Sequence, residues 1–358
     1  MKFLLLLVLI LTGYQTIAQQ ADSLKSKLQV YGSLDVYYGY DFNEPDSRER
    51  PYFLYSHTKH NNISINTAVL GVRYENDFLR GTVALLAGDY SVRNYAAEEQ
   101  LFQNIYEAYV GVKLSENLWL DAGVFSSHIG IEGGVGPGNP TLTRSLVAHS
   151  SPFYESGIKL GYQLNEKWFF SALILNGWQN ISETNNAKAL GTQITFQPQS
   201  NLTLNSSTFI GEGNNAPDNL ESFRFFHNFY LIWEPTSKVY LAFAFDVGTD
   251  KLETRANGEY QNWLGTSLIT NYQLTSKWKL IGRLEYFDDP GNVIFTDNSV
   301  TGPNLTGISA GADFSPVPNL YFRTEGKYFS GNGDLFEKKG EMTTDSNFAI
   351  FTSLGILF

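Results

Sequence analysis

The chain has 358 residues, a formal net charge of −11 and no cysteine. The acidic balance argues against a nucleic-acid partner, because phosphate backbones are bound by basic surfaces. The lack of cysteine excludes a disulfide framework and a lipid-modified N-terminal cysteine. Aromatic residues make up 15% of the chain and charged residues 17%. This balance is typical of a protein whose outer surface meets lipid.

The first segment has the layout of a secretory signal peptide. Lys2 supplies a positive start, residues 3–11 form an unbroken apolar run, and Thr16 and Ala18 place small residues before a cleavage site. Such a run is too short to span a bilayer comfortably. We expect residues 1–18 to be removed and residues 19–358 to form a single domain.

The rest of the chain is divided by seven short polar breaks between strand-like runs, which indicate hairpin turns. They lie in RYENDFLRG (from Arg73), LSENLWL (Leu114), LNEKWFF (Leu164), FQPQSNLTL (Phe196), WEPTSKVYL (Trp233), LTSKWKL (Leu274) and FSPVPNLYF (Phe314).

Eight longer polar or glycine-rich stretches alternate with these turns, at roughly residues 41–59, 90–101, 128–153, 179–188, 212–223, 248–259, 288–304 and 330–345. An even strand count with short turns at one end and long loops at the other is the layout of a bacterial outer-membrane barrel. The sequence therefore predicts an all-β fold, a transmembrane antiparallel β-barrel of about 16 strands. Its short turns would be periplasmic and its long loops extracellular, with both termini on the periplasmic side.

The strand sequences and their ends fit a membrane setting. Residues 239–247 alternate between apolar and smaller or polar side chains, as in a strand with one face on lipid and the other on a lumen. Indole rings prefer the membrane interface. Two aromatic girdles are therefore predicted, one from Trp119, Trp168, Trp233 and Trp278 beside short turns, and one from Trp178 and Trp263 at the opposite strand ends.

The last strand, SNFAIFTSLGILF, ends on Phe358 and resembles the C-terminal strand recognised by the outer-membrane assembly machinery. A wider resemblance runs from FSSHIG (Phe125) through NPTLTRSL (Asn139) and SSPFYESGIKLGYQL (Ser150) to LILNGWQ (Leu173). On these segments the whole mature chain resembles the OmpL-like β-barrel porins of Gram-negative, Bacteroidota-type bacteria. The resemblance implies an outer-membrane porin without enzymatic activity, and it names no substrate.

The chain offers few candidates for catalytic or metal chemistry. His57 and His60 lie three apart in the first long stretch, but this spacing alone defines no metal site, and a polar surface loop is the favoured interpretation. A barrel enzyme would need His128 with Ser126 and Ser127, or His149 with the serines that follow it, and no nucleophile motif surrounds either histidine. We predict no enzyme, no cofactor and no metal.

The longest connection, residues 127–153, is rich in glycine and proline in its first half and poor in charge. Apolar residues in such a loop favour folding inward over an outward surface loop. Glu132, Arg144 and His149 are then the candidate constriction residues.

By strand parity, charged side chains on the facing wall are expected to point into the lumen. They are Asp35, Glu107, Lys113, Asp121, Glu155, Lys159, Asp246, Arg283, Glu285, Asp313, Arg323, Glu325 and Lys327. Opposed acidic and basic groups would either set a transverse field or simply satisfy one another along the wall.

About sixteen strands leave an aqueous channel, whereas eight would be filled by side chains. The favoured function is therefore a porin for passive diffusion of small hydrophilic solutes, embedded in outer-membrane lipid and compatible with a homo-oligomer. Lumenal charge is mixed, and the overall charge of −11 points toward cations. The alternatives are a non-conducting surface adhesin or structural barrel, and an outer-membrane barrel enzyme.

Overall fold

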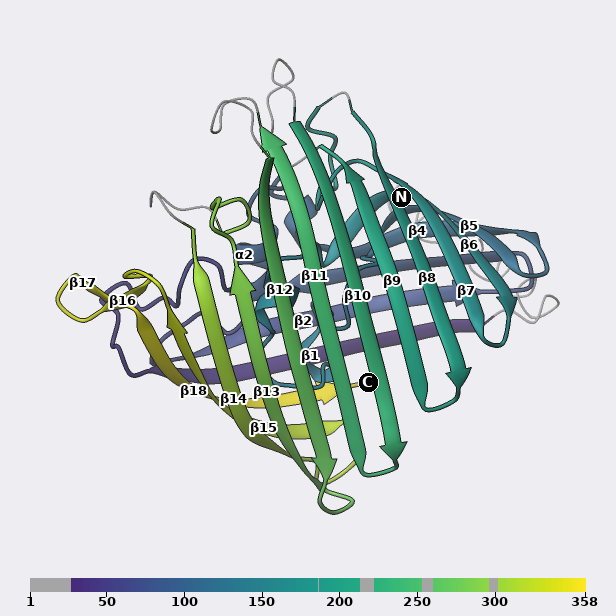
Figure 1. The fold of residues 1–358 in the computed structure, drawn as a ribbon. Coiled ribbons are helices and arrows are strands. Elements are labelled where there is room, and N and C mark those ends of the chain that lie inside the picture. Colours follow the sequence, from purple (N-terminus) through teal and green to yellow (C-terminus); the bar gives the residue numbers. More distant parts are fainter. Residues whose placement is uncertain (1–26, 186, 213–221, 253–259, 296–301) are drawn as a thin grey trace, which may run out of the picture.

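The computed structural model describes residues 27–185, 187–212, 222–252, 260–295 and 302–358, and it forms a closed antiparallel β-barrel (Figure 1). The predicted signal segment, residues 1–18, lies outside the described residues. In the described part of the chain, sixteen strands make up the barrel. The predicted fold class and strand number are confirmed.

Each barrel strand pairs with its sequence neighbours, and the sheet closes where the last strand meets the first. The strands are β1 (Lys27–Asp41), β2 (Asn62–Glu75), β3 (Leu79–Ala87), β4 (Ile105–Ser115), β5 (Leu118–Ser126), β6 (Tyr154–Asn165), β7 (Trp168–Leu175), β8 (Ala189–Gln199), β9 (Leu202–Gly211), β10 (Ser222–Thr236), β11 (Val239–Leu252), β12 (Tyr260–Gln273), β13 (Trp278–Asp288), β14 (Asn304–Phe314), β15 (Leu320–Gly331) and β18 (Ser346–Leu357).

The remaining elements lie in the long loops. They are α2 (Asp89–Asn94), η1 (Phe102–Asn104), η2 (Gly136–Gly138), α3 (Leu146–His149) and the small hairpin of β16 (Phe336–Lys338) and β17 (Met342–Thr344). Among the described residues, no helix has the length and apolar character needed to cross a membrane.

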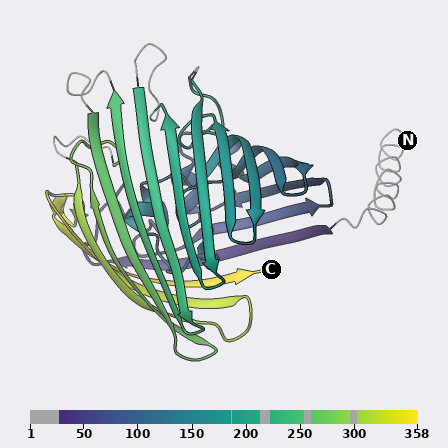
Figure 2. The same cartoon turned by 45° about the vertical axis from the view of Figure 1, so that its right-hand side comes forward.

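The register of β1 against β18 brings the two chain ends to one rim of the barrel. Ser33 pairs with Leu357, and Asp41 pairs with Ala349 near the opposite rim. Figure 2 shows the start of β1 and the end of β18 side by side. This is the rim of the short turns, so the expected arrangement of the described strand ends is confirmed.

Side chains alternate between an exposed apolar outer face and a buried inner face. On β11, Phe243, Phe245 and Val247 are exposed on the outside, whereas Ala244 and Asp246 are buried inside. Exposed apolar residues on nearly every strand make a surface that water would not tolerate but lipid does.

The predicted girdle at the short-turn rim is partly confirmed, and the second girdle is wrong. Trp233 and Trp278 are exposed on the outer face. Trp178 and Trp263 are buried inside the barrel, and the central carbon of the Arg224 guanidinium lies 4.8 and 5.4 Å from the centres of the two rings. Trp119 also faces inward. These three rings were assigned by their distance from strand ends, but strand parity places Trp119 and Trp263 on the inner face, and Trp178 lies in the loop after β7.

The first loop, residues 42–61, is not a polar surface loop, and that interpretation is wrong. Phe53, Leu54 and His57 are all buried. The Phe53 ring stacks on Phe295 with 5.0 Å between centroids and meets Phe336 edge-on. Because these rings come from three different loops, an apolar core closes inside the extracellular half of the barrel. The apolar run Tyr-Phe-Leu-Tyr at residues 52–55 was the signal for this burial.

The seam between β1 and β18 depends on the missing side chain of Gly32. A Cβ at this position would lie 2.5 Å from the Phe358 ring and 2.7 Å from the Val69 carbonyl oxygen. At Gly326, on the outer face of β15, the nearest atom of the Phe348 ring would be an ordinary 3.6 Å away.

We expect Gly32→Ala to destabilise the barrel by about 1–3 kcal/mol through overpacking of the seam. The measurement is the temperature at which the folded band on an unboiled gel converts to the unfolded band. Gly326→Ala is the matched control and should leave that temperature nearly unchanged. Equal behaviour of the two variants would show that the seam tolerates a Cβ.

Candidate pore and its constriction

The third loop, residues 127–153, crosses the interior of the barrel. It leaves β5 and returns to β6, yet it makes polar contacts with β12, β13 and β15, and β13 lies eight places from β5 around the sixteen-stranded ring. The Arg323 guanidinium donates to the carbonyl oxygens of Gly136 and Asn139, both at 3.2 Å. Asn271 donates to the carbonyl oxygen of Pro140 at 3.1 Å. The loop is therefore tied to the wall opposite its own origin.

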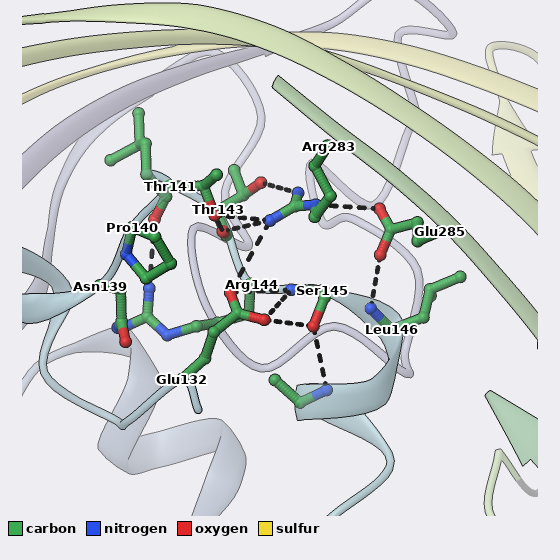
Figure 3. A network of polar contacts seen from close by, with 12 residues as sticks. Glu132, Asn139, Pro140, Thr141, Thr143, Arg144, Ser145, Leu146, Arg283 and Glu285 are labelled. Atoms are coloured by element: carbon green, nitrogen blue, oxygen red, sulfur yellow. Dashed lines mark hydrogen bonds and ion pairs between the residues drawn. The ribbon is translucent and has the colours of Figure 1, made fainter. Parts of the chain in front are cut away.

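Arg283 is the centre of this attachment (Figure 3). Its Nη1 donates to Thr141 Oγ1 at 2.8 Å and to the Thr143 carbonyl oxygen at 2.7 Å. Its Nη2 donates to Thr143 Oγ1 at 2.7 Å and to Glu325 Oε1 at 3.0 Å. Glu325 in turn accepts from the Thr143 backbone N–H at 2.8 Å. The Arg283 guanidinium and the Glu325 carboxylate thus both form hydrogen bonds with Thr143 of the loop.

A second pair of wall charges holds the short helix α3. Glu285 Oε2 accepts from the Leu146 backbone N–H at 2.6 Å, and Glu285 Oε1 lies 2.9 Å from Lys327 Nζ. Lys327 also donates to the Arg144 carbonyl oxygen at 2.8 Å. Arg283, Glu285, Glu325 and Lys327 are all buried, with two charges of each sign. Burial of charge is tolerated here because every group has an opposite partner and loop hydrogen bonds.

The three predicted constriction residues lie within the folded loop, and all are buried. The Arg144 guanidinium donates to the carbonyl oxygens of Gly133, Gly134 and Leu142 at 2.8, 2.9 and 3.1 Å. Glu132 accepts from the backbone N–H and the hydroxyl of Ser145. These contacts fix the shape of the loop, and Figure 3 shows those between Glu132 and Ser145.

His149 joins the third loop to the first. Its Nδ1 accepts a hydrogen bond from the Tyr55 backbone N–H at 3.3 Å. Burial, reinforced by the positive charges of Lys327, Arg144, Arg283 and Arg50, holds the pKa of His149 well below its usual range. The ring is therefore neutral at pH 7, as its role of acceptor requires.

The first loop has its own anchor on β1 and β2. Asp35 Oδ2 lies 3.2 Å from His57 Nε2 and accepts from Asn66 Nδ2 at 3.0 Å. The His57 ring packs edge-on against Tyr37, with 4.9 Å between centroids. Burial lowers the pKa of His57, and the Asp35 carboxylate opposes but does not cancel that effect. This anchor was missed in the sequence, where His57 was weighed only as a metal ligand.

The start of the third loop is fixed by His128. Its Nδ1 lies 2.9 Å from both oxygens of Glu155, and its Nε2 lies 3.0 Å from the Thr208 carbonyl oxygen. Both ring nitrogens face acceptors, so both carry protons. Burial works against this charge, but the Glu155 carboxylate raises the pKa of His128 above its usual value. An imidazolium held on both sides is an anchor rather than a general base.

Asp121 and Asp313, two other predicted wall residues, lie nearer the short-turn rim, whereas Glu107 lies near the long-loop end of β4. Asp121 pairs with Arg80, and Asp313 pairs with Arg323 and Lys279. Glu107 accepts from the Tyr31 hydroxyl at 3.2 Å and the Ser126 hydroxyl at 2.8 Å. Arg80 and Lys279 were missed in the sequence, although strand parity places both on the lumenal face.

The described residues contain no cluster of three or more His, Asp or Glu side chains arranged to hold a metal ion. His60 instead accepts from the Asp41 backbone N–H at 3.0 Å through its Nδ1. In the described part of the chain, no ring nitrogen of His128 or His149 forms a hydrogen bond with a serine hydroxyl. No nucleophile is therefore paired with a general base at the two positions considered for a barrel enzyme.

The sequence over residues 27–358 matches the family described as "Putative beta-barrel porin-2, OmpL-like". The chain belongs to this family. No curated protein is recognisably similar to it in sequence. The expected resemblance is confirmed, and membership in a porin family points to a channel in the outer membrane of a Gram-negative bacterium rather than to an enzyme.

Solved outer-membrane proteins share the architecture. The trimer form of OmpT from Vibrio cholerae has a TM-score of 0.64 at 13% identity, covering 93% of this chain and 99% of that one. An anion-selective porin from Comamonas acidovorans has a TM-score of 0.64 at 10% identity, covering 93% and 100%. The channel DcaP of Acinetobacter baumannii has a TM-score of 0.62 at 11% identity, covering 93% and 97%. At these identities the likeness shows the fold alone.

The Arg283 attachment predicts a large effect of a single substitution. Arg283→Met leaves Glu325 and Glu285 with Lys327 as their shared cation, and we expect a loss of about 3–5 kcal/mol from the uncompensated buried charge. The unfolding temperature on unboiled gels and protease cleavage within residues 127–153 measure it. Lys167→Met, in an exposed short turn, is the control. An Arg283→Met barrel as stable and resistant as the control would show that the loop is held elsewhere.

The histidines predict that acid weakens the docking of the loops. Undocked His57 and His149 take up protons as pH falls below about 6.5, whereas the docked rings, with lowered pKa values, resist protonation. The histidines therefore contribute their full share to the free energy of loop docking above that pH, and this contribution is lost as the pH falls below it. The raised pKa of His128 acts in the opposite direction, whereas the lowered pKa values of His57 and His149 act together. We expect faster proteolysis of the third loop at pH 5 than at pH 7, and a smaller difference in His149→Gln. A pH-independent rate in the native chain would contradict this.

Proposed function

We propose that the chain is an outer-membrane porin through which small hydrophilic solutes diffuse passively, with the third loop narrowing its water-filled lumen. The observation that supports this most strongly is the attachment of loop residues 136–146 to β12, β13 and β15, across the ring from β5. A sixteen-stranded barrel is wide enough to leave an aqueous path beside such a loop. Membership in a porin family supports the same role.

In this proposal the charged residues divide into two roles. Glu132, Arg144 and His149 hold the loop in the shape that forms the constriction. Arg283, Glu285, Glu325 and Lys327 fix the loop to the wall. Solutes pass beside the loop along polar side chains such as Gln193 and Thr195, which are partly exposed on the inner face and hydrogen-bond Asn205. This lining suits hydrophilic solutes.

We also propose how the chain reaches the outer membrane and assembles there. Residues 1–18 direct export and are removed. The assembly machinery recognises the last strand, which ends in Phe358. Lipid covers the exposed apolar belt, and identical copies associate side by side, as the trimer form of the similar OmpT from Vibrio cholerae suggests.

A non-conducting surface barrel is the second candidate, and the burial of both the first and third loops inside the barrel favours it. Single-channel recording of purified, folded protein in planar bilayers separates the two. We expect the native chain to conduct, and a variant with residues 131–141 replaced by a short Gly-Ser linker to conduct several-fold more, because the loop occupies lumenal cross-section.

The matched control shortens only the exposed tip of the β16–β17 hairpin, residues 338–341, leaves the buried Phe336 in place, and should keep the native conductance. Heat-modifiable migration on gels confirms that each variant is folded. A silent native chain with a conducting loop variant would identify a plugged surface barrel. Silence of both folded proteins would overturn the porin assignment.

A further inference from the structure

Two carboxylates on opposite walls, near the short-turn rim, each face two cations. On one wall, Arg80 of β3 binds Asp121 of β5 through Nε and Nη2 at 2.7 and 2.6 Å, and Lys159 Nζ of β6 lies 3.8 Å away. On the other wall, Asp313 of β14 is 2.8 Å from Lys279 Nζ and 2.9 Å from Arg323 Nε. Each group of two cations and one carboxylate therefore carries a net positive charge.

The cations and the carboxylates also differ in how much of each side chain is exposed to water. The side chains of Arg80, Lys159 and Lys279 are 29%, 24% and 29% exposed, whereas the carboxylates of Asp121 and Asp313 are 1% and 7% exposed. Water in this part of the lumen therefore meets the cations and not the acids that pair with them. A solute entering from the short-turn rim encounters a positive surface.

The backbone and the aromatic rings are arranged to hold these cations. Arg80 reaches Asp121 over Gly111 of the strand between them, where a Cβ would lie 2.3 Å from the Asp121 carboxylate. The Arg80 guanidinium lies 4.4 Å from the centre of the Trp119 ring, and Lys113 Nζ lies 5.9 Å from the same centre. Lys159 Nζ lies 4.4 Å from the Phe125 ring. The faces of aromatic rings stabilise cations without neutralising them.

Two neighbouring groups of charge are balanced in sign. Arg73 lies 5.3 Å from the centre of the Tyr31 ring and Glu107 accepts from the Tyr31 hydroxyl, which adds one charge of each sign. Lys27 and Glu75, at the rim itself, are directly opposite each other in the β1–β2 register. Beside these balanced pairs, the five cations Arg80, Lys113, Lys159, Lys279 and Arg323 face the two carboxylates of Asp121 and Asp313.

We propose that the four partly exposed cations among these, Arg80, Lys113, Lys159 and Lys279, form an anion-recruiting vestibule on the short-turn side of the third loop, and that the porin favours small anionic solutes. The ligand chemistry is a compact anion, such as a carboxylate or phosphate group with few carbons. This inference rests on the proposed porin function. It replaces the cation preference suggested by the overall charge of −11, because selectivity follows the charges that line the path rather than the sum over the chain.

The reversal potential of the folded chain in planar bilayers, under a gradient of KCl, tests the proposal. We expect a sign that reports chloride permeability above that of potassium. In the double variant Lys159→Gln, Lys279→Gln, Asp121 keeps Arg80 and Asp313 keeps Arg323, so no buried carboxylate loses its last partner. The reversal potential should shift toward potassium, and it should shift further when both lysines become Glu.

The control removes two lysines from exposed short turns at the same rim, Lys167→Gln and Lys277→Gln, and should shift the reversal potential far less. A native chain that conducts with potassium preference would overturn the vestibule while leaving the porin function intact. A native chain that does not conduct would overturn the porin function itself. A double variant with the native reversal potential would show that these lysines do not set selectivity.

Discussion

The arrangement of the interior depends on one requirement, that the buried charge of Arg283 be satisfied. A guanidinium with no exposure costs several kcal/mol unless its donors find acceptors and its charge finds an opposite partner. Glu325 supplies the charge partner at 3.0 Å, and the backbone and hydroxyl of Thr143 supply the acceptors. Some of these acceptors belong to the loop and others to the wall. Neither part therefore reaches its lowest free energy without the other. The position of the third loop is thus fixed by electrostatics as well as by packing.

The same requirement is met differently at the other attachment points. Asp35 accepts from Asn66 and contacts a neutral His57, whereas Glu155 lies against a protonated His128. In each case a charged side chain on a strand contacts a histidine in a loop, and the two residues are distant in the sequence. The loops are therefore part of the barrel's core, and the aromatic cluster around Phe53 fills the space that they leave.

The sequence was sufficient to predict the barrel because its signals are local. Turn residues and period-two alternation repeat often enough to count the strands, and parity assigned residues such as Arg283 and Asp121 to the inner face, where the structure buries both. The pairings of those residues were not accessible, because they depend on register between strands. Arg80 and Asp121, for example, meet only because Gly111 lies between them. Trp263 shows the converse: its distance from a turn predicts its height in the barrel, and only strand parity predicts the face of the sheet on which it lies.

The division between buried and exposed charges connects architecture to selectivity. Lys327 and Lys279 both face the lumen, but Lys327 is 1% exposed and Lys279 is 29% exposed. A fully buried cation has its field cancelled by the acid that compensates it, so it can hold a loop but cannot attract a solute. A partly exposed cation whose acid lies behind it keeps a field directed into water. The charges that hold the third loop and those that would select a solute are therefore different residues, although the alternation of the sequence places all of them on the same face.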